Sequence, residues 1–318
     1  MATSCRVQQF KTEEEIQRPI ERWVEEQEER CRNEPCNWWM LCLNRLVCWL
    51  VTVMVKVAEW VVEIVVRWLY RVVCVIVTLV AGLLLLLIGN TDVLLQALSD
   101  AWDLLKDAFF EVVGIAILIL INGVDFVQTT IGVEGKKRKL TKEEIAALQP
   151  IFGNSLLYFA IRVADGPMGI LAGVDGRAYT IGFTIYAAAP PISTIVHECV
   201  HVWQCQFGGA HYIGQSTIYQ GLEIIGWMNS PYDWQSHLGT GPDAWFLLDS
   251  VEAQAKFIED VFGSGKFVFD SGAEDLNPGA FFQKRDDGNN SFTRIASDGT
   301  TVDLTIEANG AWDYIFMP

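Results

Sequence analysis

The stretch from Leu46 to Ile88 constrains the fold of this chain more than any other segment. It contains no proline, and its first glycine is Gly82. Its charged residues recur every three or four positions, so at about 100° per residue they fall on one narrow stripe of a helix. These residues are Lys56, Glu59, Glu63, Arg67 and Arg71. The other positions are predominantly apolar, which predicts a long helix with an apolar surface around most of its circumference.

A second segment, 92–121, repeats this design after a turn signal at Gly89-Asn90-Thr91. Its polar residues again form one stripe: Asp92, Gln96, Ser99, Asp100, Asp103, Asp107 and Glu111. Residues 72–88 carry no charge, and seventeen helical residues span about 26 Å, close to the hydrocarbon core of a bilayer. We therefore interpret 37–122 as a membrane-inserting helical hairpin with its polar stripes turned inward. A large buried soluble bundle, or an oligomerisation stalk, is the alternative.

If the two helices fold back on each other at Gly89, each residue before the turn faces the residue that lies equally far after it. The position of the turn therefore fixes which residues of the two helices face each other. The predicted pairs are Arg67 with Glu111, Arg71 with Asp107, and Thr78 with Asp100. The first two pairs are opposite in charge, which matters because an unpaired charge in hydrocarbon is costly. We expect membrane lipid as a partner of the hairpin and self-association through its apolar surface. A single long helix through Gly82 and Gly89 is the alternative.

The segments that flank the hairpin are charged. Residues 1–36 are predicted to form a charged, solvent-facing helix, in which Thr12 and Glu15 fit a capping box. Residues 123–140 are predicted to form a linker that ends in Lys136-Lys137-Arg138-Lys139. These basic residues either contact anionic lipid headgroups or belong to a linker that is simply exposed to solvent. The net charge of -16 argues against nucleic acid as a partner. The eight cysteines form no CxxC pair, so we expect them to be reduced, and no secretory signal peptide is visible.

Residues 141–265 are predicted to form a separate α+β domain. Thr141 and Glu144 fit a second capping box, and Pro150 is predicted to end the helix that they open. Strands are expected at 156–163 and 178–186, and helices at 193–206, 213–227 and 250–262. In 266–318, short apolar runs alternate with Asp-Gly, Asn-Gly and Ser-Gly turns. This alternation predicts a small C-terminal segment of antiparallel strands.

The motif His197-Glu198-Cys199-Val200-His201 places two imidazoles at i and i+4, on one face of the predicted helix 193–206. Two nitrogens so placed can share one Zn²⁺. Glu198 can then take a proton from a water on the metal, because zinc lowers the pKa of that water toward about 7. Cys199 is predicted to point into the core. The alternative is a pair of helix histidines that make core hydrogen bonds.

A zinc site of this type needs a third ligand. The metzincin extension is excluded, because Gln204 and Phe207 stand where glycine and histidine are required. Glu252 lies in the first turn of the predicted helix 250–262, which is a gluzincin-type arrangement. Asp243, in Gly239-Thr240-Gly241-Pro242-Asp243, fits part of an aspzincin pattern, and Glu223 is a weaker choice. We favour Glu252 as the third ligand.

The domain resembles a known family, the extracellular contractile injection system core domain, a zincin-like metallopeptidase family. The resemblance covers about 140–262 and rests on the segments 140–144, 150–153, 178–186 and 197–204, as they stand in this sequence. In that family a later helix carries a Glu-x-Gln-Ala segment, which Glu252-Ala253-Gln254-Ala255 matches residue by residue. The resemblance therefore implies a zincin-like fold and Glu252 as a zinc ligand.

Two functions follow from these expectations. The first is a zinc-dependent metallopeptidase-like effector or accessory protein of a bacterial contractile injection system, made in the cytoplasm and membrane-associated. Its partners would be injection-particle components and a peptide or protein substrate. The second is a non-enzymatic pore-forming or anchoring protein whose zincin-like domain is a binding or structural module. Three residues are candidate proton donors opposite Glu198: Tyr219, Tyr232 and His237.

Overall fold

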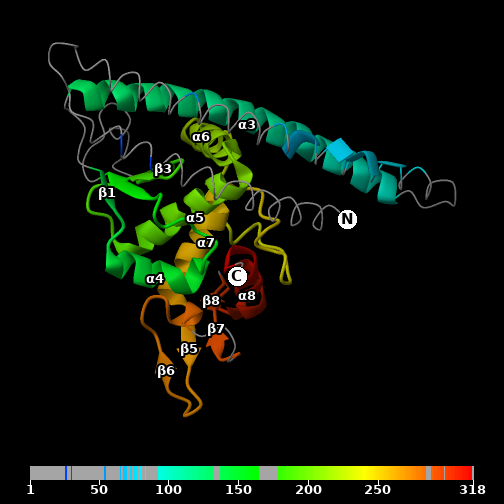
Figure 1. The fold of residues 1–318 in the computed structure, drawn as a ribbon. Coiled ribbons are helices and arrows are strands. Elements are labelled where there is room, and N and C mark those ends of the chain that lie inside the picture. Colours follow the sequence, from blue (N-terminus) through cyan, green and yellow to red (C-terminus); the bar gives the residue numbers. More distant parts are fainter. Residues whose placement is uncertain are drawn as a thin grey trace. The chain divides into compact units, whose positions relative to one another are not determined.

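The computed structural model describes residues 92–131, 137–164, 178–283, 288–296 and 298–316, together with scattered positions between Glu26 and Leu83. The described part has a mixed α+β fold with small sheets (Figure 1). The α+β class expected from the sequence is therefore confirmed. The chain divides into two compact units, one of residues 1–112 and 206–209 and the other of residues 113–205 and 210–318.

The first unit contains the beginning of helix α3 (Asp92–Ile131), which starts where the sequence predicts. The predicted end of this segment at 121 is wrong, because α3 continues through Asn122 and Gly123 to Ile131. A glycine inside a helix costs about 1 kcal/mol relative to alanine. This cost is too small to end a helix of 40 residues. The predicted linker 123–140 is therefore partly helical.

A buried ion pair in the first unit confirms one predicted pair of the hairpin. The Arg67 Nε donates to the Glu111 Oε1 at 3.0 Å, and both residues are 1% exposed. The Arg67 guanidinium also lies against Gly209, where an added Cβ would come within 2.3 Å of it. Gly209 has a φ of +66°, so both its backbone and this close approach favour glycine. Arg71, Thr78 and the turn 89–91 lie outside the described residues.

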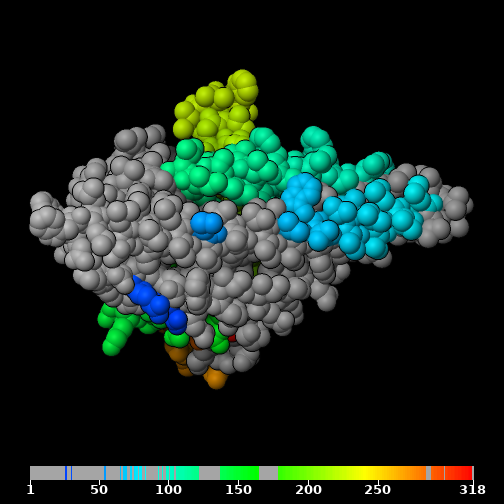
Figure 2. Space-filling model, turned by 45° about the horizontal axis from the view of Figure 1, so that its top comes forward, coloured from blue at the N-terminus to red at the C-terminus, as the bar shows by residue number. Residues whose placement is uncertain are grey.

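The helices of the first unit carry exposed apolar side chains. On α3 they recur every three or four residues along one stripe, at Leu95, Leu98, Trp102, Leu105, Phe109 and Val112. Described residues of α3 are visible at the surface in Figure 2. Further exposed apolar residues lie at Val65, Leu69, Val72, Val73, Ile76, Val77, Val80 and Leu83. Among the described residues, no helix combines the length and apolar character needed to cross a membrane.

The second unit contains a four-stranded sheet in the order β1–β2–β4–β3. The strands are β1 (Lys137–Lys139), β2 (Arg162–Ala164), β3 (Tyr179–Ile181) and β4 (Thr184–Tyr186). Strands β2 and β4 are parallel, and the other two pairs are antiparallel. The Gly182-Phe183 turn joins β3 to β4, with a φ of +59° at Gly182. A turn of this kind favours glycine.

Three expectations for this sheet need correction. The segment 178–186 is a hairpin and not one strand, and in 156–163 only Arg162 and Val163 are in a strand. The basic residues Lys137–Lys139 are not linker but strand β1, paired with β2. Strand formation depends on the available pairing partner more than on local propensity, which is why these bounds were missed.

Helix α4 (Lys142–Phe152) opens with the predicted capping box. The Thr141 hydroxyl accepts from the Glu144 backbone N–H, and the Glu144 carboxylate accepts from the Thr141 N–H. The prediction that Pro150 ends this helix is wrong, because Ile151 and Phe152 continue it. Both are fully buried, and the Trp312 indole donates to the Pro150 carbonyl at 3.0 Å. Core packing therefore outweighs the break that proline favours.

The core of the second unit lies around α5 (Ile192–Gly208) and α7 (Val251–Ser264), with α6 (His211–Ile224) beside them (Figure 1). These bounds lie within three residues of the predicted helices 193–206, 213–227 and 250–262. The apolar face of α5 is fully buried at Ile195, Val196, Cys199 and Val200, so Cys199 points into the core as predicted. Each such side chain contributes about 1.5–3 kcal/mol to stability. This packing holds α5 and α7 in a fixed relation.

The C-terminal segment contains the expected short antiparallel strands and one helix that the sequence did not predict. The strands are β5 (Lys266–Val268), β6 (Glu274–Asp275), β7 (Asn290–Ser291), β8 (Thr293–Ile295) and β9 (Thr301–Asp303). A 3₁₀ turn, η2 (Ala280–Phe282), precedes β7, and α8 (Thr305–Phe316) follows β9. Helix α8 packs against α4 through Trp312 and Ile315, which are both buried.

Candidate metal centre

Helix α5 carries the two histidines of the sequence motif on one face. His197 and His201 are one helical turn apart, and their ring centroids are 5.0 Å from each other. Both side chains are buried, with 8% and 4% of their surfaces exposed. The core packing of α5 on its opposite face fixes this orientation.

Helix α7 brings Glu252 to the two imidazoles. The Glu252 Oε2 lies 3.3 Å from the His197 Nε2 and 3.1 Å from the His201 Nε2. Glu252 is in the first turn of α7, and the Ser250 side chain caps that turn by accepting from the Ala253 N–H. The cap fixes where α7 starts and thereby the position of Glu252.

The second nitrogen of each imidazole faces a hydrogen-bond acceptor. The His197 Nδ1 lies 3.2 Å from the Glu259 Oε2. Glu259 follows Glu252 by about two helical turns on α7. The His201 Nδ1 lies 2.8 Å from the Gln204 Oε1, and the Gln204 amide donates in turn to the Val251 carbonyl at 3.1 Å. Each Nδ1 therefore carries the donated proton, and each Nε2 faces Glu252. Partners of this kind orient the histidine ligands of metal ions.

Three acceptor atoms thus converge on one point: two Nε2 atoms and one carboxylate oxygen. Acceptors that face one another at this range require a cation between them, either a proton or a metal ion. Among the described residues, His197, His201 and Glu252 form the group whose ligand atoms lie within 4.8 Å of one another. The arrangement can hold a metal ion.

The histidines and Glu252 shift one another's pKa values toward their charged forms. Burial opposes the charge of His197, but Glu252 and Glu259 outweigh it and raise the pKa of this imidazole to about 10. Burial likewise opposes the charge of His201, and Glu252 raises its pKa. Burial opposes ionisation of Glu252, yet the two imidazoles hold its pKa well below the ordinary value. A metal ion would take the place of the proton between Glu252 and the imidazoles, because a histidine must be neutral to act as a ligand.

Glu198 lies on α5 between the two histidines and is 3% exposed. Its Oε2 accepts from the Thr180 hydroxyl of β3 at 2.7 Å. Burial raises the pKa of Glu198, and the two imidazoles oppose this effect. A carboxyl group whose pKa is raised toward neutrality is suited to accepting a proton.

The other candidate ligands lie elsewhere. The Asp243 Oδ1 accepts from the Tyr314 hydroxyl at 2.8 Å in an exposed position. Glu223 is half-buried on α6. Neither belongs to the group of potential ligands found among the described residues. The distances therefore favour Glu252, as expected.

Of the three candidate proton donors, Tyr232 has a contact with the cluster. Its ring centroid lies 6.0 Å from that of His197. His237 is exposed, with its Nδ1 2.9 Å from the Asp233 carbonyl oxygen. Tyr219 is half-buried on α6.

Sequence reasoning missed the polar residues around the cluster. Thr180, Ser216, Gln220 and Glu259 contact its members, and the Tyr212 ring stacks on His201 at 5.8 Å. One signal was available for Glu259, because it follows Glu252 by seven residues and so lies on the same face of α7. Ser216 and Gln220 are likewise four residues apart on one face of α6.

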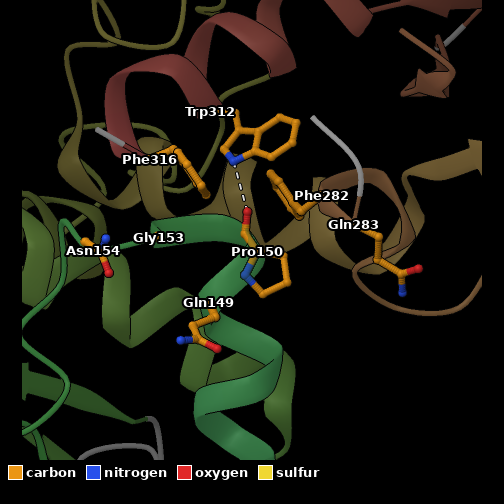
Figure 3. Close-up of a pocket in the computed structure, with 8 residues that line it drawn as sticks. All are labelled: Gln149, Pro150, Gly153, Asn154, Phe282, Gln283, Trp312 and Phe316. Atoms are coloured by element: carbon orange, nitrogen blue, oxygen red, sulfur yellow. Dashed lines mark hydrogen bonds between the residues drawn. The ribbon is translucent and has the colours of Figure 1, made fainter. Parts of the chain in front are cut away.

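A separate hollow of about 410 Å³ lies between α4, η2 and α8 (Figure 3). It is lined by Gln149, Pro150, Gly153, Asn154, Phe282, Gln283, Trp312 and Phe316. Figure 3 shows the hydrogen bond from the Trp312 indole to Pro150 at this hollow. The described residues that line it include no ionisable side chain and no member of the histidine cluster.

Comparisons with known proteins give no assignment for this chain. No protein-family model matches it, and searches of the curated proteins and of the solved structures found no match.

Proposed function

We propose that this chain is a zinc-dependent metallopeptidase-like protein in which His197, His201 and Glu252 hold the metal. The convergence of the Glu252 Oε2 on two Nε2 atoms, at 3.3 and 3.1 Å, carries the proposal. Tetrahedral zinc with bonds of about 2.0–2.1 Å has its ligand atoms about 3.3 Å apart. Two imidazole nitrogens and one carboxylate oxygen are also a usual ligand set of catalytic zinc. The residues therefore fit zinc in both donor type and spacing.

When bound, zinc would polarise a water molecule and the carbonyl group of a peptide bond. Glu198 would accept a proton from that water as the general base, and Thr180 would hold its carboxylate in place. Tyr232, beside His197, is the proton donor that we favour. Burial of the whole cluster strengthens the interactions between these groups, because the local dielectric constant is low.

The resemblance to the extracellular contractile injection system core domain supports a biological setting. In this setting the protein is an effector or accessory protein of a bacterial contractile injection system. Its partners would be injection-particle components and a peptide or protein substrate.

The test is zinc-dependent cleavage of a peptide mixture by the full chain. We expect cleavage that a chelator abolishes and added zinc restores. Cleavage that continues unchanged after complete removal of the metal would contradict the proposal.

A second function, membrane insertion by the N-terminal hairpin, is favoured by the buried pair Arg67–Glu111. Two helical segments that bury one ion pair and expose Leu98, Trp102 and Leu105 have a pattern that suits a lipid-facing hairpin. We expect the full chain to float with vesicles of anionic phospholipid, and the double variant Leu98→Lys/Leu105→Lys to lose this association. Equal flotation of both proteins would contradict insertion through this stripe.

A further inference from the structure

Two side chains of α6 hold the carboxylate of Glu252 from the side opposite the histidines. The Ser216 hydroxyl donates to the Glu252 Oε1, and the Gln220 amide donates to the same oxygen at 2.9 Å. Ser216 and Gln220 are four residues apart, so they lie on one face of α6. Together they form a clamp on a single carboxylate oxygen.

The two oxygens of Glu252 therefore have different surroundings. The Oε2 faces two imidazole nitrogens, and the Oε1 faces two hydrogen-bond donors. Glu252 is 3% exposed, so its carboxylate sits in a low-dielectric surrounding, where bonds of this kind strengthen. Rotation of the carboxylate that brought the Oε1 toward the histidines would break both donor contacts.

This difference bears on how Glu252 binds a metal. A carboxylate can offer one oxygen or two, and the second oxygen would take up an additional coordination position. Catalytic zinc sites keep one position open for water or substrate. We propose that Ser216 and Gln220 are positioning residues, which hold Glu252 so that the Oε2 alone is offered to the metal. This inference rests on the proposed function.

Gln220 also reaches a second member of the site. Its amide nitrogen lies 3.1 Å from the Tyr232 hydroxyl as well as 2.9 Å from Glu252. Gln220→Leu therefore affects Tyr232 as well as the carboxylate. The Gln220 amide also donates to the Ser216 hydroxyl at 3.1 Å, so Ser216→Ala removes one acceptor of Gln220 but leaves its contact with Tyr232 in place. Ser216→Ala is for this reason the primary test of the clamp, and Tyr232→Phe separates the effect of the tyrosine.

The experiment measures zinc affinity of the full chain by competition with a chromogenic chelator. We expect Ser216→Ala and Gln220→Leu to weaken zinc binding about 10- to 100-fold, as is typical for changes in residues that support metal ligands. Thr217→Ala, an exposed hydroxyl residue next to Ser216 on α6, is the matched control and should bind zinc like the unaltered chain. Tyr232→Phe should also keep its zinc affinity, because it leaves both donors to Glu252 in place.

A spectroscopic measurement separates positioning from general loss of structure. With cobalt(II) in place of zinc, we expect Ser216→Ala to shift the visible absorption toward the weaker bands of a higher coordination number, because the freed oxygen can then bind. Circular dichroism of the metal-free variants checks that they fold. Equal zinc affinities and equal cobalt spectra in the unaltered chain and in Ser216→Ala would overturn the clamp alone. Failure of the unaltered chain to bind zinc would overturn the proposed function and the clamp with it.

Discussion

Two groups of buried ionisable side chains in the described part of the chain are built in different ways. In the first unit, at the pair predicted for the hairpin, Arg67 and Glu111 are opposite charges that face each other at 3.0 Å. In the cluster on α5 and α7, His197, His201 and Glu252 direct acceptor atoms at one common point. The first arrangement joins a donor to an acceptor of opposite charge, whereas the second brings acceptors together and requires a cation between them.

The side chains around the two groups also differ in polarity. Around the cluster, each imidazole has a second polar partner, and the free oxygen of Glu252 has two donors. The hairpin pair instead belongs to helices whose other described side chains are largely apolar and exposed. Several ionisable groups that converge form a candidate site for a metal ion, whereas two opposite charges that pair hold two segments in register.

The largest effect is expected at Glu198. We predict that Glu198→Gln keeps the zinc but lowers the rate of peptide cleavage by a factor of about 10²–10⁴, because the general base is lost. Zinc content and cleavage rate are measured on the same preparation. Glu223→Gln, on α6 outside the ligand group, is the control and should retain both. Unchanged activity in Glu198→Gln would favour the non-enzymatic function.

Breaking the hairpin pair should be the next largest effect. Glu111→Leu removes the ion pair of the buried Arg67, and breaking a buried ion pair from one side typically costs about 3–5 kcal/mol. We expect the double variant Arg67→Met/Glu111→Leu to recover most of this loss, because no buried charge remains. Urea unfolding of the three proteins gives the free energies. A double variant as unstable as the single one would show that the pair does not fix the register.

A smaller effect is expected at Thr180. Thr180→Val keeps the side-chain shape and removes the donor to Glu198, which leaves a buried carboxylate oxygen with one partner fewer. We expect a loss of about 1–3 kcal/mol in the free energy of unfolding. The matched control is Thr184→Val in β4, a half-buried threonine of the same sheet. Equal losses in the two variants would mean that the bond to Glu198 contributes nothing specific.

The smallest effect is expected at Glu144, outside both regions. Burial raises the pKa of Glu144, but Arg138 at 2.8 Å and the Thr141 N–H outweigh it and lower the pKa below the usual 4.5. The stabilisation is therefore present above pH 4.5 and is lost as the pH falls through the lowered pKa. We expect Glu144→Gln to cost about 0.5–1 kcal/mol at pH 7. The difference from the unaltered chain should shrink in acid.

The control for this prediction is Glu143→Gln, an exposed neighbour in the same first turn. Its unfolding free energy should follow that of the unaltered chain at every pH. A pH-independent difference between Glu144→Gln and the unaltered chain would contradict the assigned role of the carboxylate.

The sequence predicted those features that depend on local spacing. His197 and His201 share a helical face because they are four residues apart, and the capping box of Thr141 and Glu144 spans a single turn. The Arg67–Glu111 pair was predictable because one turn position fixes the register of two helices. Glu252 was favoured from its position in the first turn of a predicted helix, and the resemblance to a family strengthened this choice over Asp243. Its distance along the chain says little about its distance in space.

The features that the sequence did not predict depend on packing between distant segments. Ser216, Gln220 and Glu252 meet because α6 and α7 pack beside α5, and no local pattern determines that arrangement. Pro150 lies inside α4 because Trp312, far along the chain, binds its carbonyl group. Lys137–Lys139 form a strand because β2 is available to pair with them. In each case the tertiary partner overrides the local preference.

The central claim is that His197, His201 and Glu252 together hold one metal ion. The most direct test is the zinc content of the purified full chain and of the variants His197→Ala, Glu252→Ala and Asp243→Asn. We predict one zinc per chain in the unaltered protein and in Asp243→Asn, and little or none in His197→Ala and Glu252→Ala. Full zinc content in Glu252→Ala, together with its loss in Asp243→Asn, would contradict the account.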